Sequence, residues 1–412
     1  MSKQVKVKAM EGSKIIELSS FLKYADAFYL SIGLLVYDRE KDKGTHSWYH
    51  SLLHWYFILQ MLNLNFALVT ELIYVFLAIS GGTNFLEATM NMSFIGFVIV
   101  GELKIWLIWR QREHLTLVVN ELERLHPRSA KEQAVYNIKD HLSSYSRVSI
   151  FYFSMHLLLI WTYNLYWVAY YLIYDLWLGV RKFERMLPYY CWVPWDWTEG
   201  MSYYFIYVSQ NIAGQACLSG QLSADLMMCA LVTLLVMHFR QLGSQIEQFK
   251  AGIGTEKQDM KFLHAAIRYH QRLLQLSDDI NNVFGVSLLC NFVSSSFIIC
   301  FVGFHMTIGG KLDNVVMLVL FLFCAMVQVF MISNYAQRLL DSSEYIGQAV
   351  YNHDWFNADI LYRKMLVLIT RRSQKPSRVK ATSFLNVSLV TVTDILQLSY
   401  KFFALLRTMY MK

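Results

Sequence analysis

Long, uninterrupted apolar stretches constrain this chain more than any other feature of its sequence. Seven of them are long enough to cross about 30 Å of hydrocarbon as helices of roughly 20 residues, near residues 52–76, 86–109, 149–173, 203–238, 284–306, 314–336 and 386–409. Backbone groups in lipid must be hydrogen-bonded within each spanning segment, so the sequence predicts an all-α integral membrane protein with seven transmembrane helices. The last stretch is the weakest because it contains Asp394 and Lys401.

The positions of Lys and Arg predict how these helices are oriented. Residues 1–48, 110–147, 240–283 and 338–382 contain most of them, whereas the alternate loops contain only Arg181, Lys182, Arg185 and Lys311. Loops rich in Lys and Arg stay in the cytoplasm, so we expect a cytoplasmic N-terminus and an extracellular C-terminus. A seven-helix G-protein-coupled chemoreceptor has its N-terminus outside, and this asymmetry argues against that class.

Several other functions lack support in the sequence. The net charge of +7 lies on loops beside anionic lipid, so it does not indicate nucleic-acid binding. The six Cys form no paired CxxC, and His46, His50 and His54 share a helix face without a Cys or acidic ligand, so we expect no metal. Walker, HExxH and GxSxG motifs do not occur, so we expect neither an enzyme nor a cofactor.

The spans and loops divide the chain into four parts. Residues 1–48 are expected to be cytoplasmic, with an amphipathic or re-entrant helix in FLKYADAFYLSIGLLVY. Residues 49–338 contain helices one to six and an extracellular loop at 174–202, residues 339–382 a cytoplasmic anchor helix, and residues 383–412 the last span. Residues 256–283 and 349–370 have helical apolar spacing, which favours a packed cytoplasmic helical layer over solvated loops.

Polar residues of the last span gather on one helix face. At 100° per residue the face contains Asp394, Gln397, Lys401, Leu405 and Thr408. A mixed stripe of this kind on a membrane helix most simply lines water, and a ring of Leu405 side chains around an axis could close the path by dewetting. The alternative is a buried helix in which Asp394 pairs with Lys401.

The loop LPYYCWVPWDW at residues 187–197 is stiffened by two Pro and carries Trp192, Trp195 and Trp197. Large rings in a loop need an apolar surface. We expect them on the outer rim of the bundle, part at the membrane interface and part as a roof over a ligand vestibule.

Two ordered stretches resemble the insect odorant receptor family. The loop followed by YYFIYVSQ is similar to that family's second extracellular loop and fourth helix. The C-terminal stretch, with Trp355, the RSQKP run from Arg372 and the Ser399-Tyr400 pair, is similar to its C-terminal signature. The short segment between the fourth and fifth spans resembles an odorant-specific subunit rather than the co-receptor. Leu406-Arg407 after Ser399-Tyr400 departs from the related gustatory-type receptor channels, which remain an alternative.

This resemblance implies a ligand-gated, non-selective cation channel in the plasma membrane of olfactory sensory neuron dendrites. It implies a heterotetramer with an obligatory co-receptor through the cytoplasmic anchor helices, a pore lined by the last helix, and a gate at Leu405 and Met409. Lys401 on the pore face is a departure. A solute transporter would instead show inverted repeats and paired broken spans, and the sequence shows no such pairing.

The resemblance also places the odorant site in the outer half of the bundle, between helices two, three, four and six. A site for a volatile apolar ligand should be enclosed and contain few polar groups. The candidates are Met90, Phe94, Tyr163, Trp167, Tyr207, Ile212, Gln215, Met317 and Phe321.

Overall fold

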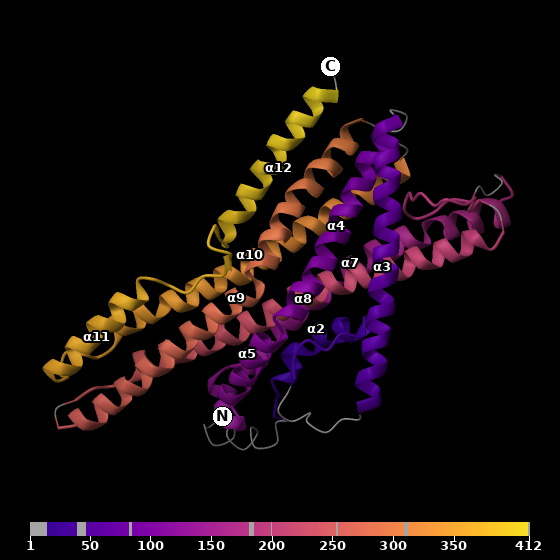
Figure 1. Ribbon diagram of the computed structural model, residues 1–412. Helices are drawn as coiled ribbons and strands as arrows, with labels where there is room; N and C mark the ends of the chain where they lie inside the picture. Colours follow the sequence, from indigo (N-terminus) through magenta and orange to yellow (C-terminus); the bar gives the residue numbers. More distant parts are fainter. Residues whose placement is uncertain are drawn as a thin grey trace.

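The computed structural model describes residues 15–38, 47–81, 85–180, 185–198, 200–252, 254–308 and 312–410. His46, Arg181, Lys182, Lys311 and the side chain of Met90 lie outside this part of the chain. The described part is almost entirely helical (Figure 1). Its elements are α2 (Ser19–Ser31), α3 (Ser47–Gly81), α4 (Phe85–Arg110), α5 (Arg112–Leu125), α6 (Ala130–Val135), α7 (Ile138–Tyr170), the π-helical turn η2 (Tyr171–Trp177), α8 (Ser202–Gln248), α9 (Glu256–Ile308), α10 (Leu312–Asn352), α11 (Ile360–Ser373), β1 (Lys380–Ala381), β2 (Leu385–Asn386) and α12 (Leu389–Tyr410).

Within the described residues, seven helices are long and apolar enough to cross a membrane, namely α3, α4, α7 with η2, α8, α9, α10 and α12. This confirms the predicted seven-helix, all-α fold. Several helices are longer than the predicted spans. α7 begins at Ile138, α8 continues to Gln248, and α10 continues to Asn352. Residues 256–283 join the fifth span in one uninterrupted helix, α9. No Pro occurs where residues 256–283 meet the fifth span, and the polar residues Asp278 and Asn281 do not interrupt a helix.

Helix α8 is the central helix of the bundle. Every residue from Ala216 to Phe239 is buried, and α2, α4, α7 and α10 pack around it. Its small residues allow the close approach of α4: a Cβ atom on Gly220 would lie 2.5 Å from Cδ1 of Ile105, and one on Gly101 would lie 2.8 Å from Sγ of Cys217. The hydrophobic effect does not drive helices together in lipid, so the close packing that small residues allow stabilises such a crossing.

The amphipathic helix expected near the N-terminus is α2. Its apolar face buries Phe21, Leu22, Ala25 and Tyr29 in the main core, and the Ser31 hydroxyl donates to the Ser219 hydroxyl of α8 at 2.8 Å. Gly33 follows the helix with φ of +77°, a conformation that favours glycine, and a Cβ atom there would lie 2.7 Å from the Leu53 carbonyl oxygen of α3.

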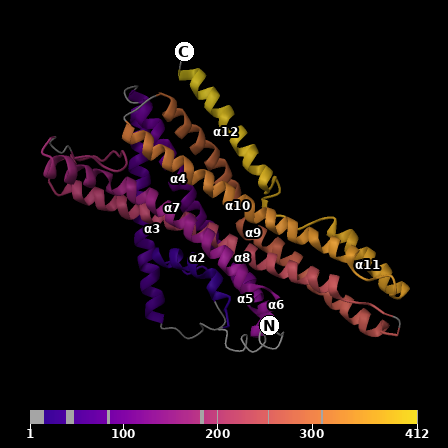
Figure 2. The ribbon, with the colours of Figure 1, turned by 180° about the vertical axis from the view of Figure 1, so that it is seen from behind.

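Beyond the seven-helix bundle, the extensions of α8, α9 and α10 pack on one another, and α11 lies along α10 and α9 (Figures 1 and 2). Phe249 stacks on Phe262 with ring centroids 3.8 Å apart, and Leu273 and Leu276 are buried. Residues 256–283 and residues 349–370 therefore form packed helices rather than solvated loops. Residues 349–370 do not form one continuous helix, because α10 ends at Asn352 and α11 begins after Asp359. The Asp359 carboxylate caps the Leu361 amide at 3.2 Å.

The short β1–β2 hairpin connects α11 to α12. Asn281 of α9 holds it, since its side chain donates to the Arg378 carbonyl at 2.8 Å and accepts from the Lys380 amide at 2.9 Å. α12 then runs along α9 and α10 at one side of the bundle (Figure 2).

Candidate ligand cavity and pore helix

An enclosed apolar cavity lies inside the bundle. Its volume, taken as the space that the centre of a water-sized sphere can occupy, is about 40 Å³. Its walls come from α3, α4, α7, α8, α10 and the loop before α8, and they consist of Leu64, Ala67, Glu71, Phe94, Phe97, Val98, Leu159, Ile160, Tyr163, Tyr189, Gln210, Ala213, Gly214, Cys217 and Phe321.

Four aromatic rings define one side of this cavity. Phe94 is at their centre, with ring centroids 5.1 Å from Tyr163, 5.4 Å from Tyr189 and 5.6 Å from Phe321. Edge-to-face and offset contacts of this kind fix the ring positions without polar groups. The cluster joins α4, α7, α10 and the loop, so a ligand that displaced one ring would disturb all four segments.

The predicted ligand residues fall into three groups. Phe94, Tyr163 and Phe321 line the cavity, and Met317 packs in the apolar cluster beside it. Ile212 and Gln215 line a separate recess of about 260 Å³ between α2, α3, α7 and α8. Trp167 packs on Tyr166 and Tyr170, and the Tyr207 hydroxyl donates to the Asn164 carbonyl, so neither lines the cavity.

The loop at 185–198 closes the cavity through Tyr189 rather than through its Trp rings. The Tyr189 ring is buried in the cavity wall, and its amide and carbonyl both bond the side chain of Gln210, at 3.3 and 2.9 Å. The Trp192 amide donates to the Thr70 carbonyl at 3.0 Å, which ties the loop to α3.

The Trp side chains lie on the outer rim of the loop. Trp192 and Trp195 are partly exposed, Trp195 Nε1 donates to the Ser202 hydroxyl at 2.7 Å, and Trp197 stacks near Tyr203. Cys191, directly before Trp192, is buried, and burial raises the pKa of its thiol to about 12, so the thiol stays protonated at neutral pH.

Sequence reasoning missed the contribution of the first span and of Tyr189 and Gln210. Leu64, Ala67 and Glu71 of α3 form one wall. An acidic residue inside an apolar span was the available signal for Glu71, because such residues almost always face the interior of the bundle.

A buried ionic cluster inside the bundle was also missed. Lys104 of α4 pairs with Asp225 of α8 at 2.7 Å, and the same carboxylate accepts from the Tyr152 hydroxyl of α7 at 2.8 Å and from Gln328 Nε2 of α10 at 2.7 Å. Four helices therefore share one carboxylate.

The predicted pore face of α12 is uncovered in the single chain. Asp394, Gln397, Lys401, Leu405 and Thr408 are all exposed, with Leu405 at 57% and Met409 at 69%. The opposite side packs on the bundle, where Ile395 and Ser399 are buried and Phe402 stacks on Phe297 at 5.1 Å. Among the described residues no ion pair joins Asp394 to Lys401 within the chain.

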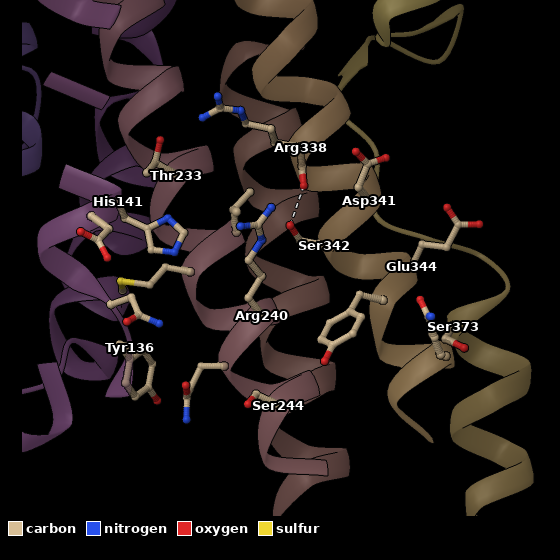
Figure 3. Close-up of a pocket in the computed structure, with 18 of the residues that line it drawn as sticks. Tyr136, His141, Thr233, Arg240, Ser244, Arg338, Asp341, Ser342, Glu344 and Ser373 are labelled. Atoms are coloured by element: carbon tan, nitrogen blue, oxygen red, sulfur yellow. Dashed lines mark hydrogen bonds between the residues drawn. The ribbon is translucent and has the colours of Figure 1, made fainter. Parts of the chain in front are cut away.

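A third and larger recess is an open polar groove of about 1420 Å³ between the start of α7, α8, α10 and α11 (Figure 3). Arg240 and Arg338 reach into it from neighbouring helices, and Tyr136, His141, Asp341 and Glu344 also line it. Volatile ligands need apolar enclosure, so this groove is a poor odorant site.

Comparison with known proteins gives consistent results. The sequence family described as 7tm Odorant receptor matches residues 84–400. The chain is 69% identical to the putative odorant receptor 85d of Drosophila melanogaster, over 98% of this chain and 97% of that protein. It is 42% identical to odorant receptor 85b of the same species, over 95% of this chain and 100% of that protein.

The fold matches solved structures despite low sequence identity. The insect olfactory receptor OR5 from Machilis hrabei, in complex with eugenol, superposes with a TM-score of 0.81 over 94% of this chain and 97% of that chain, at 16% identity. A second structure of the same receptor gives a TM-score of 0.74 over 93% of this chain and 96% of that chain, at 17% identity.

Proposed function

Because the chain belongs to the insect odorant receptor family, we propose that it is the odorant-binding subunit of a ligand-gated, non-selective cation channel. In this proposal it assembles with a co-receptor of the same fold into a heterotetramer. The observation that carries the proposal is the polar face of α12, which includes Asp394, Gln397 and Lys401, all of them exposed in the single chain. One such helix cannot enclose a pore, so a conducting path requires copies from neighbouring subunits.

The ligand site is the cavity walled by Phe94, Tyr163, Tyr189 and Phe321, and the ligand is a small volatile compound. The eugenol complex of OR5, a protein of the same fold, supports this class of ligand. Because the cavity is only about 40 Å³, a volatile compound must displace wall side chains to enter, and ring displacement is the step that reports its presence.

The gate lies at Leu405 and Met409, near the end of α12. The ligand acts on it through α10, which contributes Phe321 to the cavity and packs against α12.

Orientation follows the distribution of Lys and Arg, so the protein is a multi-pass protein of the plasma membrane with its N-terminus and α11 in the cytoplasm. An epitope tag at the N-terminus should be reached by antibody only after the cells are permeabilised.

Whole-cell current in cells that express the chain with and without the co-receptor tests this function. Volatile compounds should evoke a fast current that requires both chains and reverses near zero. Leu405→Ala should change the closed-state leak or the gating, whereas Leu396→Ala, on the opposite face of α12, should not. A surface-expressed pair that never conducts, or two variants with the same effect, would remove the support for this pore.

A seven-helix G-protein-coupled chemoreceptor remains the alternative of a different class. It predicts an N-terminal tag accessible on intact cells and a slow response that blocking G proteins abolishes.

A further inference from the structure

The enclosed cavity and the recess of about 260 Å³ lie on opposite faces of α8. At 100° per residue, the positions of α8 that line the cavity share one face, and those that line the recess share the face about 180° away. Both spaces are also lined by α3 and α7, so they are neighbours inside the bundle. On α8 the cavity is lined by Gln210, Ala213, Gly214 and Cys217, and the recess by Asn211, Ile212, Gln215, Ala216 and Ser219.

The recess opens at the side of the bundle. Tyr56, Trp161 and Ile212 line it, are exposed, and belong to membrane-spanning helices. α3, which forms one of its walls, lies on the side of the bundle away from α12 (Figures 1 and 2). In the channel proposed above, α12 faces the pore and the other subunits. The recess therefore faces lipid.

The wall between the two spaces is thinnest where α7 packs on α8. Gly214 has no side chain, and a Cβ atom there would lie 3.3 Å from Cδ1 of Ile160. Ile160 and Gly214 line the cavity, whereas the residues that follow them in the chain, Trp161 and Gln215, line the recess. One apolar side chain against a glycine therefore separates the cavity from the recess.

Other boundaries of the cavity are closed by hydrogen bonds of ordinary length. Asn63 of α3 donates to the Ser209 carbonyl of α8 at 2.9 Å, and the Ser209 hydroxyl donates back to Asn63 Oδ1 at 2.6 Å. The loop is held where Gln210 bonds the Tyr189 backbone. Beside Gly214, by contrast, the Tyr189 hydroxyl donates to Asn164 only at 3.4 Å, which is long for such a bond. The boundary between α7 and α8 is therefore the least firmly closed.

We propose that the ligand enters the cavity from the membrane, through this recess and between Ile160 and Gly214. The proposal rests on the ligand-binding function above and adds a second site, which holds a small, mainly apolar compound before it enters. Such compounds leave water for hydrocarbon, so the bilayer concentrates them beside the recess. Movement of the Ile160 side chain away from Gly214 then joins the two spaces.

The test uses 3-trifluoromethyl-3-phenyldiazirine, a small apolar compound that dissolves in bilayers and attaches to neighbouring side chains when it is illuminated. The purified complex with the co-receptor, in lipid nanodiscs, is mixed with this compound and illuminated after increasing delays. Peptide mass spectrometry then locates the label, with Trp161 reporting the recess, Phe321 the cavity and the exposed Leu158 of α7 the lipid.

Three variants are compared with the wild type. Ile212→Trp fills the recess from an exposed position, and Ile160→Ala widens the gap beside Gly214. Val208→Trp is the matched control, because Val208 is exposed one turn before Ile212 on the same side of α8 but does not line the recess.

We expect the recess to be labelled before the cavity in the wild type. Ile212→Trp should slow labelling of the cavity about tenfold or more, because the added ring obstructs the passage, and leave labelling of Leu158 unchanged. Ile160→Ala should accelerate labelling of the cavity, and Val208→Trp should match the wild type.

Currents in whole cells give a second measurement. With each compound of the volatile panel that evokes current, Ile212→Trp should slow activation and deactivation together and leave the half-maximal concentration unchanged, since an obstructed passage affects entry and exit alike.

Labelling of the cavity at the same rate in the wild type and in Ile212→Trp would overturn the route, as would a cavity that is never labelled. Labelling of the cavity that depends on the recess, without current from any volatile compound, would support the route and count against the channel. Currents whose rates are the same in Ile212→Trp and the wild type would support the channel and overturn the route.

Discussion

The Nζ atom of Lys104 lies 2.7 Å from a carboxylate oxygen of Asp225, and the two side chains are only 1% and 3% exposed. The pair connects α4 to the central helix α8. Tyr152 and Gln328 bond the second oxygen of the carboxylate, so its main accepting positions are occupied. A buried pair of this kind fixes the relative positions of helices, although it adds little net stability compared with well-packed apolar residues.

Lys104→Met should destabilise the protein by about 3–5 kcal/mol, because it leaves the Asp225 carboxylate buried without a cation. The unfolding temperature of the purified receptor and its surface level should both fall. The double variant Lys104→Met with Asp225→Leu should recover part of this loss, since no buried charge then remains. A single variant as stable as the wild type would show that the pair does not exist in the folded receptor.

Gly220→Ala should separate α4 from α8, because the new methyl group would lie 2.5 Å from Ile105. Overpacking of this degree costs about 1–3 kcal/mol, and we expect a lower unfolding temperature. Gly303→Ala is the matched control, since its Cβ would meet only Phe403 at 3.9 Å. Equal stability of the two variants would mean that the helices do not cross this closely.

Replacing Trp192 and Trp195 with Ala should impair folding or ligand response, because their rings cover the rim of the loop that places Tyr189 over the cavity. A loss of about 1 kcal/mol, equivalent to roughly a fivefold rise in half-maximal ligand concentration, is expected from the lost ring contacts. Trp177→Ala, at a more exposed ring outside this loop, serves as the comparison. Unchanged surface level and dose response in the double variant would contradict this role.

The ion pair between Glu121 and Arg272 predicts a pH dependence of stability. Arg272 bonds both carboxylate oxygens, at 2.7 and 2.9 Å, which joins α5 to α9 and holds the pKa of Glu121 below its ordinary value. A lowered pKa in the folded state means that the stabilisation is present at neutral pH and disappears as the pH falls through that pKa.

Glu121→Gln should therefore cost less than about 1 kcal/mol near neutral pH, because Arg272 is partly exposed, and nothing once the pH is well below the lowered pKa of Glu121. Unfolding temperatures of the wild type and the variant, measured across this range, should converge at the acidic end. Curves that run parallel at every pH would exclude the ion pair as the cause.

Helix count and helix type were predictable because they depend on local hydrophobicity, and the polar face of α12 was predictable because helical angle alone defines it. The length of α9 was not, because no breaker separates residues 256–283 from the fifth span and their apolar spacing only permits a helix.

The composition of the cavity was only partly predictable. Phe94, Tyr163 and Phe321 lie on helices that the family resemblance assigned to the site, and they line the cavity. Glu71 and Tyr189 also line it, but they come from the first span and from a loop, and their position depends on how these segments pack against α4 and α8. The pairing of Lys104 with Asp225, 121 positions apart, is likewise a property of the packed bundle.

Current through outside-out patches excised from cells that express the chain and the co-receptor tests the channel function most directly. With no nucleotide in the pipette, a volatile ligand that activates the intact cells should open the current within the time of solution exchange, and Leu405→Ala should alter it. A response that is present in whole cells but lost on excision, and restored only by GTP, would contradict a ligand-gated channel and favour a G-protein-coupled receptor.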